Sequence, residues 1–356
     1  MPTVEELLES ADVQSYVQQR EYPLTVGDTL FPSTKIDDFE IEYILGANEA
    51  PVSASVHAED TESQVATREG FETVKQGLAS IKRKIMMNER LIKQLSRARQ
   101  DAEVQQVIDR IYNDVDNMVN AVRTRVEAMR FEAVSSGQLS INENGFKTTV
   151  DYRVPEGHKT ALSGTDLWTD FNANPLEDIE SWVNQVIEST GTTPTRMLTS
   201  NKVFNTLKRH GTISKAINGD NGRLVTNAEL NTFLQEQGLP AIATDDRRYR
   251  VQVNDGSYET RRFFPEEKIV LLPSEALGQT VYGLTAEEVE LQNITSSQFQ
   301  NFGNIIAQIY STPDPVARWT KAVATALPSF PTANQVFIAS VVGSGSNGQV
   351  GNGGEA

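Results

Sequence analysis

The sequence predicts an α+β fold, in which strands and helices alternate along the chain without a regular period. Two patterns carry this prediction. From Val104 to Ala133, apolar residues recur every three or four positions, which is the period of a helix with one buried face. Elsewhere apolar and polar residues alternate, as at Phe39, Ile41 and Tyr43, which is the period of a strand with one dry face.

The composition is that of a globular chain of roughly two domains by length. Of its 356 residues, 38% are hydrophobic and 22% are charged, which excludes wholesale disorder. The chain has 32 Lys and Arg against 48 Asp and Glu, and its formal net charge is −16. That charge argues against a protein whose main task is to grip nucleic acid. The lack of Cys excludes disulfides, thiolate metal sites and cysteine nucleophiles.

No export signal or membrane span is expected. The chain opens with MPTVEELLES, which is acidic where a signal peptide would be basic and then apolar. The longest aliphatic stretch, Val336 to Val342, is far shorter than the ~20 residues that cross a bilayer. We therefore expect a soluble protein.

The N-terminal third predicts an arm, a hairpin and two helices. A short acidic helix is expected near residues 4–17, followed by an irregular arm to residue 35. The alternation that begins at Phe39 turns at Gly46-Ala-Asn48 and continues through Val52, Ala54 and Val56, as in a long hairpin. A first helix is expected over 76–99, where Leu78, Ile81, Ile85, Ile92 and Leu95 fall at helical spacing.

The second helix carries the stripe from Val104 to Ala133, and about 30 residues at 1.5 Å each make a rod of ~45 Å. Gly137 is expected to end it with a left-handed cap. A hairpin with an Asn144-Gly145 turn follows, from Leu139 to Val150.

The rest of the chain predicts shorter elements. Trp168 lies in a polar loop, and an amphipathic helix follows over 175–188 with Ile179, Trp182, Val183, Val186 and Ile187 inward. We further expect helices at 201–210 and 229–237, strands at 192–198, 241–244 and 268–272, an antiparallel pair at 249–253 and 261–264, and ordered segments at 305–310, 316–327 and 335–342.

No constellation of residues predicts catalysis, a metal or a cofactor. His57, His158 and His210 lie in different elements and lack metal-ligand spacing. The glycines Gly343, Gly345 and Gly348 match a dinucleotide-binding string, but the helix that should follow is missing. The paired acids Asp37-Asp38 and Asp245-Asp246 are read as solvated side chains.

Charge is segregated in the N-terminal hundred residues. Residues 1–62 hold 14 acids against Arg20 and Lys35, and residues 76–99 hold seven bases against Glu89 alone. Single-sign patches favour a partner of opposite charge. We hypothesise that the arm and hairpin of one copy lie over the 76–99 segment of a neighbour. The acids assigned to this contact are Asp37, Asp38, Glu40, Glu42, Glu59, Asp60 and Glu62, and the bases are Lys82, Arg83, Lys84, Arg90, Lys93 and Arg97.

In this order of parts the chain resembles the major capsid proteins of tailed bacteriophages, in the lambda-like branch. The resemblance covers nearly the whole chain. It rests on the arm and hairpin from Tyr22 to Ala58 and on MRFEAVSSGQLSI, NENGFKTTVDYRVP, SGTDLWTDFNANPLEDIESWVNQVIE, SNKVFNTLKRH, RRFFPEEKIVLLPSEALGQTVYGLTAEEVE and STPDPVARWTKAVATALPSF.

The resemblance implies the HK97-type capsid fold and a non-enzymatic, structural role. The implied parts are an N-terminal arm at 1–35, an E-loop hairpin at 36–75, a peripheral domain with a long spine helix at 76–180 and 300–342, and an axial domain at 181–299. Independently of the resemblance, the Gly-, Ser- and Asn-rich composition of residues 343–356 predicts a flexible tail.

It also implies self-assembly into hexamers and pentamers that form an icosahedral head around phage double-stranded DNA. That DNA would be enclosed without sequence-specific binding. Further implied partners are a separate scaffolding protein, a portal and a decoration protein. The capsid would be part of the virion and would assemble in the bacterial cytoplasm.

Three other readings remain. An encapsulin-type bacterial compartment shares the fold and would package enzymes. An α+β enzyme would need a polar constellation in a pocket. A DNA-binding protein would need a wider basic surface than one segment provides.

Overall fold

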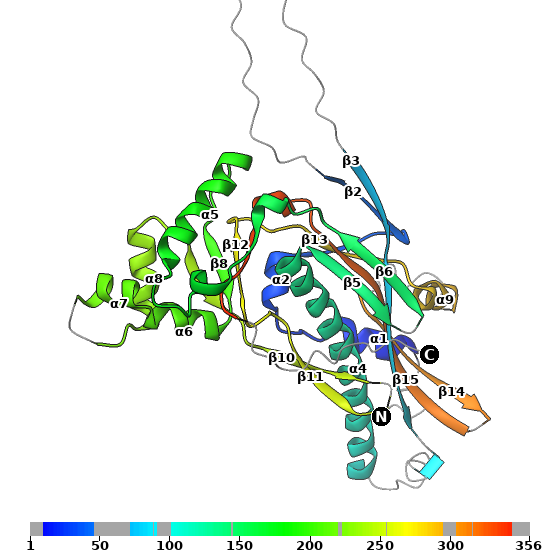
Figure 1. Cartoon of the computed structure of the whole chain (residues 1–356). Helices are drawn as coiled ribbons and strands as arrows, with labels where there is room; N and C mark the ends of the chain where they lie inside the picture. Colours follow the sequence, from blue (N-terminus) through cyan, green and yellow to red (C-terminus); the bar gives the residue numbers. More distant parts are fainter. Residues whose placement is uncertain are drawn as a thin grey trace, which may run out of the picture. The chain divides into compact units, whose positions relative to one another are not determined.

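The computed structural model describes residues 10–45, 72–87, 89–90, 101–143, 145–219, 223–253, 255–294, 304–314 and 316–343 (Figure 1). The chain divides into two compact units, which are considered separately. The first unit comprises residues 1–45, 72–130 and 278–330, and the second comprises 46–71, 131–277 and 331–356.

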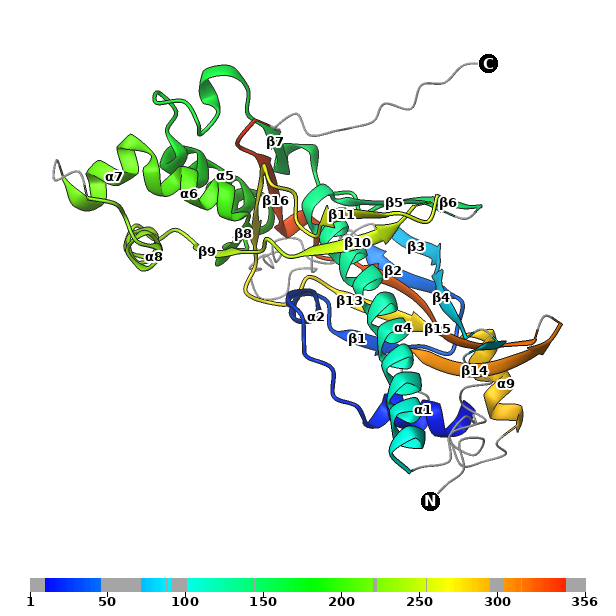
Figure 2. The same ribbon diagram turned by 90° about the horizontal axis from the view of Figure 1, so that it is seen from below.

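A five-stranded sheet forms the framework of the first unit. Its central strand, β15 (Val316–Ser329), pairs antiparallel with β4 (Ala79–Met87), β14 (Ile306–Pro313) and β13 (Gln279–Gly283). β4 pairs with residues of β15 that also pair with β14 and with β13. β4 must therefore lie along one edge of β15, and β13 and β14 must lie one after the other along its opposite edge. β1 (Ser33–Lys35) then extends the sheet by pairing parallel with β13 (Figure 2).

The long helix α4 (Asp101–Ser136) confirms the predicted rod. Its buried stripe follows the predicted spacing and consists of Ile111, Val115, Met118, Val122, Val126, Met129 and Ala133. Gly137 ends the helix as predicted. Its φ is 72°, and its N–H donates to the carbonyl oxygen of Ala133 over 2.9 Å.

The helix predicted over 76–99 is wrong where the structure describes that segment, because residues 79–87 form strand β4. Nine consecutive residues of β4 pair with β15, from Ala79 opposite Ala326 to Met87 opposite Arg318. The spacing of four between Ile81 and Ile85 fits both a helix and one face of a strand, so the pattern was ambiguous. Pairing with a strand more than 200 positions away decided the outcome.

The predicted hairpin has a different second strand. β2 (Glu40–Leu45) pairs antiparallel with β3 (Glu72–Gly77), from Glu40 opposite Gly77 to Leu45 opposite Glu72. The predicted turn and the return strand at 52–56 lie outside the described residues. We call the β2–β3 pair the acidic ribbon, because Asp37, Asp38, Glu40 and Glu42 lie at its first strand.

The N-terminal arm contains two helices, α1 (Ser10–Gln19) and α2 (Val26–Leu30). The helix predicted near residues 4–17 is thus confirmed from residue 10 and extends to residue 19, while residues 4–9 lie outside the described residues. The side-chain amide of Gln14 accepts a hydrogen bond from the N–H of Ala307 (2.9 Å) and donates to the carbonyl of Ile305 (3.4 Å). It thereby satisfies backbone groups of β14, whose opposite edge pairs with β15.

A second five-stranded sheet organises the second unit, in the order β7-β16-β12-β8-β9. Figure 1 shows α5 to α8 gathered beside β8 and β12. Its strands are β7 (Lys159–Ala161), β8 (Arg196–Thr199), β9 (Ala241–Thr244), β12 (Lys268–Leu272) and β16 (Phe337–Ser340), and its helices are α5 (Pro175–Thr190), α6 (Asn201–Arg209), α7 (Gly211–Asn218) and α8 (Asn227–Glu236).

The core of this unit includes the residues predicted to face inward from α5. Ile179, Trp182, Val183 and Val186 are buried, while Ile187 is half-buried. Trp168, which was predicted to lie in a polar loop, is 1% exposed, and its indole N–H donates to Asp178 over 2.8 Å. A burial of this kind is not visible from the polarity of its neighbours.

Two hairpins complete the second unit. β5 (Gln138–Glu143) pairs with β6 (Phe146–Asp151) close to the predicted range, and β10 (Arg248–Gln252) pairs with β11 (Tyr258–Arg262), which begins three residues before the predicted strand at 261–264. The sequence reasoning missed α2, α7, β1, β7, β13 and α9 (Ala286–Ile294). The tail beyond residue 343 lies outside the described residues.

Candidate assembly surface

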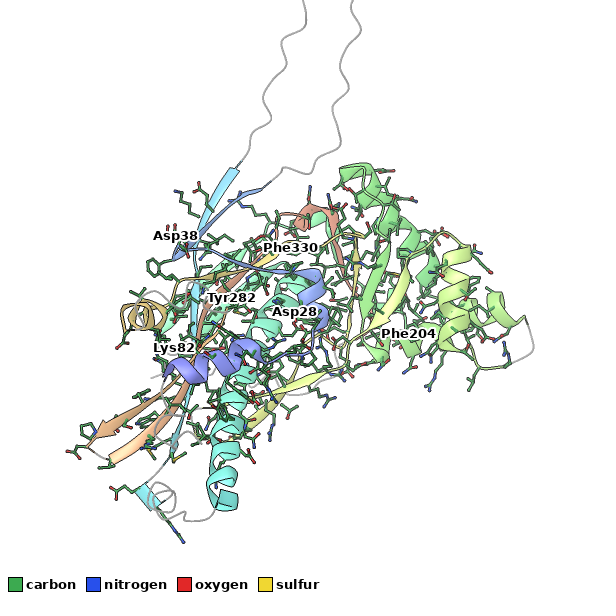
Figure 3. All side chains as sticks on the ribbon, turned by 180° about the vertical axis from the view of Figure 1, so that it is seen from behind. Asp28, Asp38, Lys82, Phe204, Tyr282 and Phe330 are labelled. Carbon is green, nitrogen blue, oxygen red and sulfur yellow. The ribbon has the colours of Figure 1, made fainter. Side chains whose placement is uncertain are left out.

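The acids of the acidic ribbon are exposed. Asp37, Asp38, Glu40 and Glu42 all point to solvent, and Figure 3 shows Asp38 beside the ribbon. Glu42 lies 3.5 Å from Lys75 across the pair, with both side chains more than half exposed. Among the described residues, Asp37, Asp38 and Glu40 have no ion-pair partner. Surface pairs such as Glu42–Lys75 contribute ~0–1 kcal/mol, so the ribbon keeps its negative charge available.

The base of the ribbon is fixed to the sheet. The N–H of Leu284 donates to the carbonyl oxygen of Asp38 over 3.4 Å, and the N–H of Leu78 donates to that of Phe39 over 3.0 Å. A Cβ added to Gly283 would lie 2.5 Å from the Asp38 carbonyl oxygen and would also meet Leu78. Glycine at 283 therefore permits this close approach, which sets where the ribbon leaves the sheet.

The predicted bases divide between the two faces of β4. Lys82 lies 3.6 Å from Glu287 of α9, and Lys84 lies 4.4 Å from the centre of the Trp319 ring. Arg83 lies between them in sequence and therefore points to the other face of the strand. Arg90 is exposed. Lys93 and Arg97, like Glu59, Asp60 and Glu62 among the acids, lie outside the described residues.

Among the described residues, Asp37, Asp38 and Glu40 form no ion pair with any of the predicted bases of the same chain. Glu42 instead pairs with Lys75, and Lys82 with Glu287. Glu287 also pairs with Lys321, and Lys35 pairs with Glu288 over 2.6 Å. Burial opposes ionisation of Glu287, but the hydrogen bond from Lys321 and the positive charges of Lys321 and Lys82 together outweigh burial and lower the pKa of this carboxyl group. These acids of α9 were missed by the sequence reasoning.

Apolar side chains accompany the bases on one face of the sheet. The registers set Tyr310 opposite Trp319 and Trp319 opposite Met86, so the three residues form a row across β14, β15 and β4. Met86 is 50% exposed and Tyr310 is 37% exposed. We call Lys84, Met86, Tyr310 and Trp319 the sheet patch. Its two rings and the ammonium group of Lys84 suit a protein partner with acidic and apolar side chains.

A buried charge cluster clamps the N-terminal arm to α4. Arg130, 4% exposed at its side chain, donates to Asp28 (2.6 Å), Glu127 (3.2 Å) and the hydroxyl of Thr280 (2.7 Å). Glu127 also accepts a hydrogen bond from the N–H of Gly27 (3.1 Å). Figure 3 shows Asp28 and Tyr282 in this unit, next to α4 and β13. We call Asp28, Glu127 and Arg130 the arm clamp.

A tyrosine cluster holds the preceding part of the arm. The hydroxyls of Tyr16 and Tyr22 donate to the two oxygens of Asp116 (3.1 and 3.0 Å), and Arg20 pairs with the same carboxylate (2.9 Å). Burial and the negative charge of Asp116 raise the pKa of Tyr22. A cavity of about 210 Å³ remains between the arm and α4, lined in part by Tyr22, Arg123 and Tyr282. The arm is therefore held at discrete polar contacts.

The histidines and the second acidic pair have structural partners. The Nε2 atom of His158 lies 2.8 Å from the Ser189 hydroxyl, and burial lowers the pKa of this histidine. His210 contacts Thr212 and the carbonyl oxygen of Asp170. The prediction that Asp245 is solvated is wrong, because this residue is 4% exposed and pairs with Arg247 over 2.6 Å. Asp246 is half-buried and pairs with Arg262 over 2.6 Å. His57 lies outside the described residues.

Within the described ranges, no group of three or more His, Asp or Glu is arranged to hold a metal ion. The same ranges contain no helix both long and apolar enough to cross a bilayer. The described surface therefore offers the acidic ribbon, the sheet patch with its two rings and one lysine, and the clamped arm.

Comparisons with known proteins agree with this description. The chain matches the family model described as phage major capsid protein E over residues 9–341. No curated protein matches it. A solved phage-related protein from Bordetella bronchiseptica is 12% identical, with a TM-score of 0.56 over 92% of this chain and 95% of that chain.

A protein assigned as the capsid protein of an Escherichia coli prophage is 16% identical, with a TM-score of 0.55 over 76% of this chain and 80% of that chain. An encapsulin from Synechococcus elongatus is 10% identical over 92% of this chain and 94% of that chain, and its TM-score of 0.36 is too low to indicate a relationship.

Proposed function

The chain belongs to the family of phage major capsid protein E, and we propose that it assembles into the hexamers and pentamers of an icosahedral phage head. The predicted capsid-protein role and HK97-like fold are thereby confirmed at the level of the family. A capsid protein acts by binding copies of itself, so its surfaces take the place of an active site. We assign the chain no catalytic activity.

The observation that carries the assembly proposal is the uncompensated charge of the acidic ribbon. Asp37, Asp38 and Glu40 are exposed and have no ion-pair partner among the described residues. Lys84 in β4 and Arg90, three positions beyond the end of that strand, have no described carboxylate partner either. Opposite charges that remain apart in one chain can meet between two copies. We therefore assign the ribbon of one subunit to the β4 segment and sheet patch of a neighbour.

The parts of the subunit follow from the same proposal. Residues 1–35 serve as the N-terminal arm and 36–75 as the E-loop. Residues 76–180 with 300–342 form the peripheral domain, 181–299 the axial domain and 343–356 the tail. The contact set keeps all the predicted residues, including Glu59, Asp60, Glu62, Lys93 and Arg97, but Lys82, Arg83 and Lys84 contribute from a strand rather than a helix.

The head would enclose double-stranded DNA without reading its sequence. Its further partners would be a separate scaffolding protein, a portal and a decoration protein. The subunits would assemble in the bacterial cytoplasm and remain in the virion. An encapsulin-type shell is the alternative, and the cargo distinguishes the two: a phage head holds DNA, and an encapsulin holds enzymes.

Electron microscopy of the purified chain, alone and with its scaffolding protein, tests the function. Closed shells, or rings of five and six subunits, are the expected result. A monodisperse monomer or dimer under all conditions would contradict it.

A charge exchange tests the contact itself. The variant Asp37→Lys/Asp38→Lys and the variant Lys84→Glu/Arg90→Glu should each block shell formation, because each sets like charges against one another at the interface. Combining the two should restore shells in part. Assembly by either variant alone, at the level of the unmodified chain, would exclude the proposed contact.

A further inference from the structure

The β10–β11 ribbon of the second unit presents arginines on one face. Its register sets Arg248 opposite Arg262, Arg250 opposite Thr260 and Gln252 opposite Tyr258. Opposite residues share a face of an antiparallel pair, and so do alternate residues along each strand. These six side chains therefore lie on one face, which we call the arginine face.

The opposite face of this ribbon is already used within the unit. The ring of Tyr249 lies 4.7 Å from that of Phe263, which in turn lies 5.9 Å from Phe131. Arg261 is neutralised by Glu259 over 2.7 Å, and this hydrogen bond raises the pKa of Arg261. Among the described residues, the arginine face is consequently the one whose positive charge is not paired off within the ribbon.

Two of the three arginines on this face keep their charge. Arg262 pairs with Asp246 (2.6 Å) and Glu266 (3.1 Å). Arg248 and Arg250 are exposed, and no described carboxylate pairs with either of them. Arg250 lies 5.3 Å from the ring centre of Tyr258, which is 53% exposed and holds the guanidinium in place. The unpaired positive charge of Arg248 and Arg250 stands out in a chain that has 48 acidic residues and only 32 basic ones.

We propose that the arginine face binds the phosphate backbone of double-stranded DNA on the inner surface of the shell. The proposal rests on the proposed function, which brings DNA into the shell; that this face is turned toward the DNA is part of the proposal. Guanidinium groups bind phosphate oxygens in a bidentate manner. The hydroxyls of Thr260 and Tyr258 and the amide of Gln252 add neutral groups of the kind that also contact phosphates. Such contacts position DNA without reading its sequence.

The composition of the face favours DNA over a protein partner. Besides the tyrosine ring, it carries no apolar side chain that could form the dry centre of a protein interface. Its three cations are all arginine. Two phosphate contacts per subunit bind weakly, but many copies in one shell act together on a continuous duplex. The low affinity of a single chain also agrees with its net charge of −16.

Binding of the unassembled full chain to a short fluorescent duplex, measured by anisotropy over a series of salt concentrations, tests the proposal. The variant Arg248→Gln/Arg250→Gln should bind more weakly. Its slope of log affinity against log salt should be smaller by about 1.8, since each phosphate contact contributes about 0.9. The variant Arg209→Gln/Lys215→Gln removes the same charge from exposed positions on α6 and α7 and should keep the slope.

Shells supply an independent measurement of orientation. Because the chain has no Cys, Thr260→Cys introduces a single thiol on the arginine face. A bulky maleimide should label this thiol in dissociated subunits and not in closed shells.

The outcomes separate the two proposals. Failure to form shells would count against the function, whereas the duplex measurement tests the arginine face by itself. No duplex binding by the unmodified chain at low salt, an unchanged slope in the double variant, or equal labelling of intact shells would each overturn the DNA contact. If the double variant keeps its duplex affinity but loses shell formation, the face binds another copy instead.

Discussion

Arg130 of α4 donates a hydrogen bond to the carboxylate of Asp28 over 2.6 Å, across 102 positions of sequence. The same guanidinium group contacts Glu127 over 3.2 Å, one helical turn earlier in α4. One buried cation thus binds a carboxylate of the arm and a carboxylate of the helix. This arrangement fixes the arm to the body of the first unit. Substitutions in it should therefore change the stability of the chain, the attachment of the arm and the dependence of stability on pH.

Arg130→Met should be strongly destabilising. The substitution would remove the Arg130 guanidinium group from the Glu127 carboxylate, whose side chain is 3% exposed. Removing one partner of a buried ion pair costs about 3–5 kcal/mol because the other charge remains desolvated. Denaturant unfolding measures this loss. Arg123→Met is the control, since Arg123 lies on the same helix, is 28% exposed and approaches Asp28 only to 3.7 Å. It should cost under about 1 kcal/mol, and equal losses in the two variants would contradict the clamp.

Gly27→Ala should dislodge the arm. A Cβ at position 27 would overlap the Glu127 carboxylate and lie 2.9 Å from the Cδ atom of Arg130, which the buried clamp cannot accommodate. Overpacking of this kind costs about 1–3 kcal/mol. Limited proteolysis should cut the arm faster in this variant, while α4 keeps its helicity by circular dichroism. In Gly77→Ala, where no atom lies within 4 Å of the added carbon, proteolysis should be unchanged.

Acid should weaken the clamp through Asp28. Burial by itself raises the pKa of this carboxyl group, but the hydrogen bond from the Thr25 N–H and the charge of Arg130 outweigh burial and lower it below the ordinary 3.8. The stability gained is therefore complete above about pH 4 and is lost as the pH falls through the lowered value. Melting curves between pH 6 and 2 measure this loss.

Asp28→Asn should show a smaller fall in melting temperature over that acid range than the unmodified chain, because it has no carboxylate there to protonate. Asp37→Asn, on the exposed acidic ribbon, is the matched control and should fall as the unmodified chain does. An identical acid dependence in Asp28→Asn and the unmodified chain would exclude the role of Asp28.

Trp182→Ala should destabilise the second unit. Its ring stacks between Trp168 (5.8 Å, 18°) and Phe337 (5.2 Å, 15°), and it is 6% exposed. Truncating a buried tryptophan costs about 3–5 kcal/mol through lost transfer energy and the cavity left behind. Denaturant unfolding measures the cost, and near-ultraviolet circular dichroism should lose the signal of the stacked indoles. Phe171→Ala, at a ring that is 76% exposed, should change stability by less than about 0.5 kcal/mol.

The elements that could be predicted are those whose apolar pattern repeats over many residues or whose ends carry recognisable capping or turn residues. The stripe of α4 repeats over many turns, which no strand pattern can imitate, and Gly137 marks its end. The β5–β6 hairpin and α5 also follow from local turn chemistry and spacing. Short strands such as β13 and β1 were missed, because a few residues carry little periodicity and depend on their partners in the sheet.

The candidate surface was predictable only in part. The sequence indicated where acids and bases gather, and Asp37, Asp38, Glu40 and Arg90 are indeed exposed. It gave no indication that Lys82 would be engaged by Glu287 or that Lys84 would lie over Trp319. These partners are more than 200 positions away, and only the pairing of β4 with β15 brings Trp319 next to Lys84.

By itself, the sequence determined the class of the fold, the long helix and the segregation of charge, because periodicity, capping and composition act over neighbouring residues. Tertiary structure alone decided that residues 79–87 form a strand, that β2 pairs with 72–77, and that Arg130 reaches Asp28. The physical reason is that the backbone groups of a strand form their hydrogen bonds with other strands, and that a buried charged side chain needs an oppositely charged partner, and both kinds of partner can lie far away in the sequence.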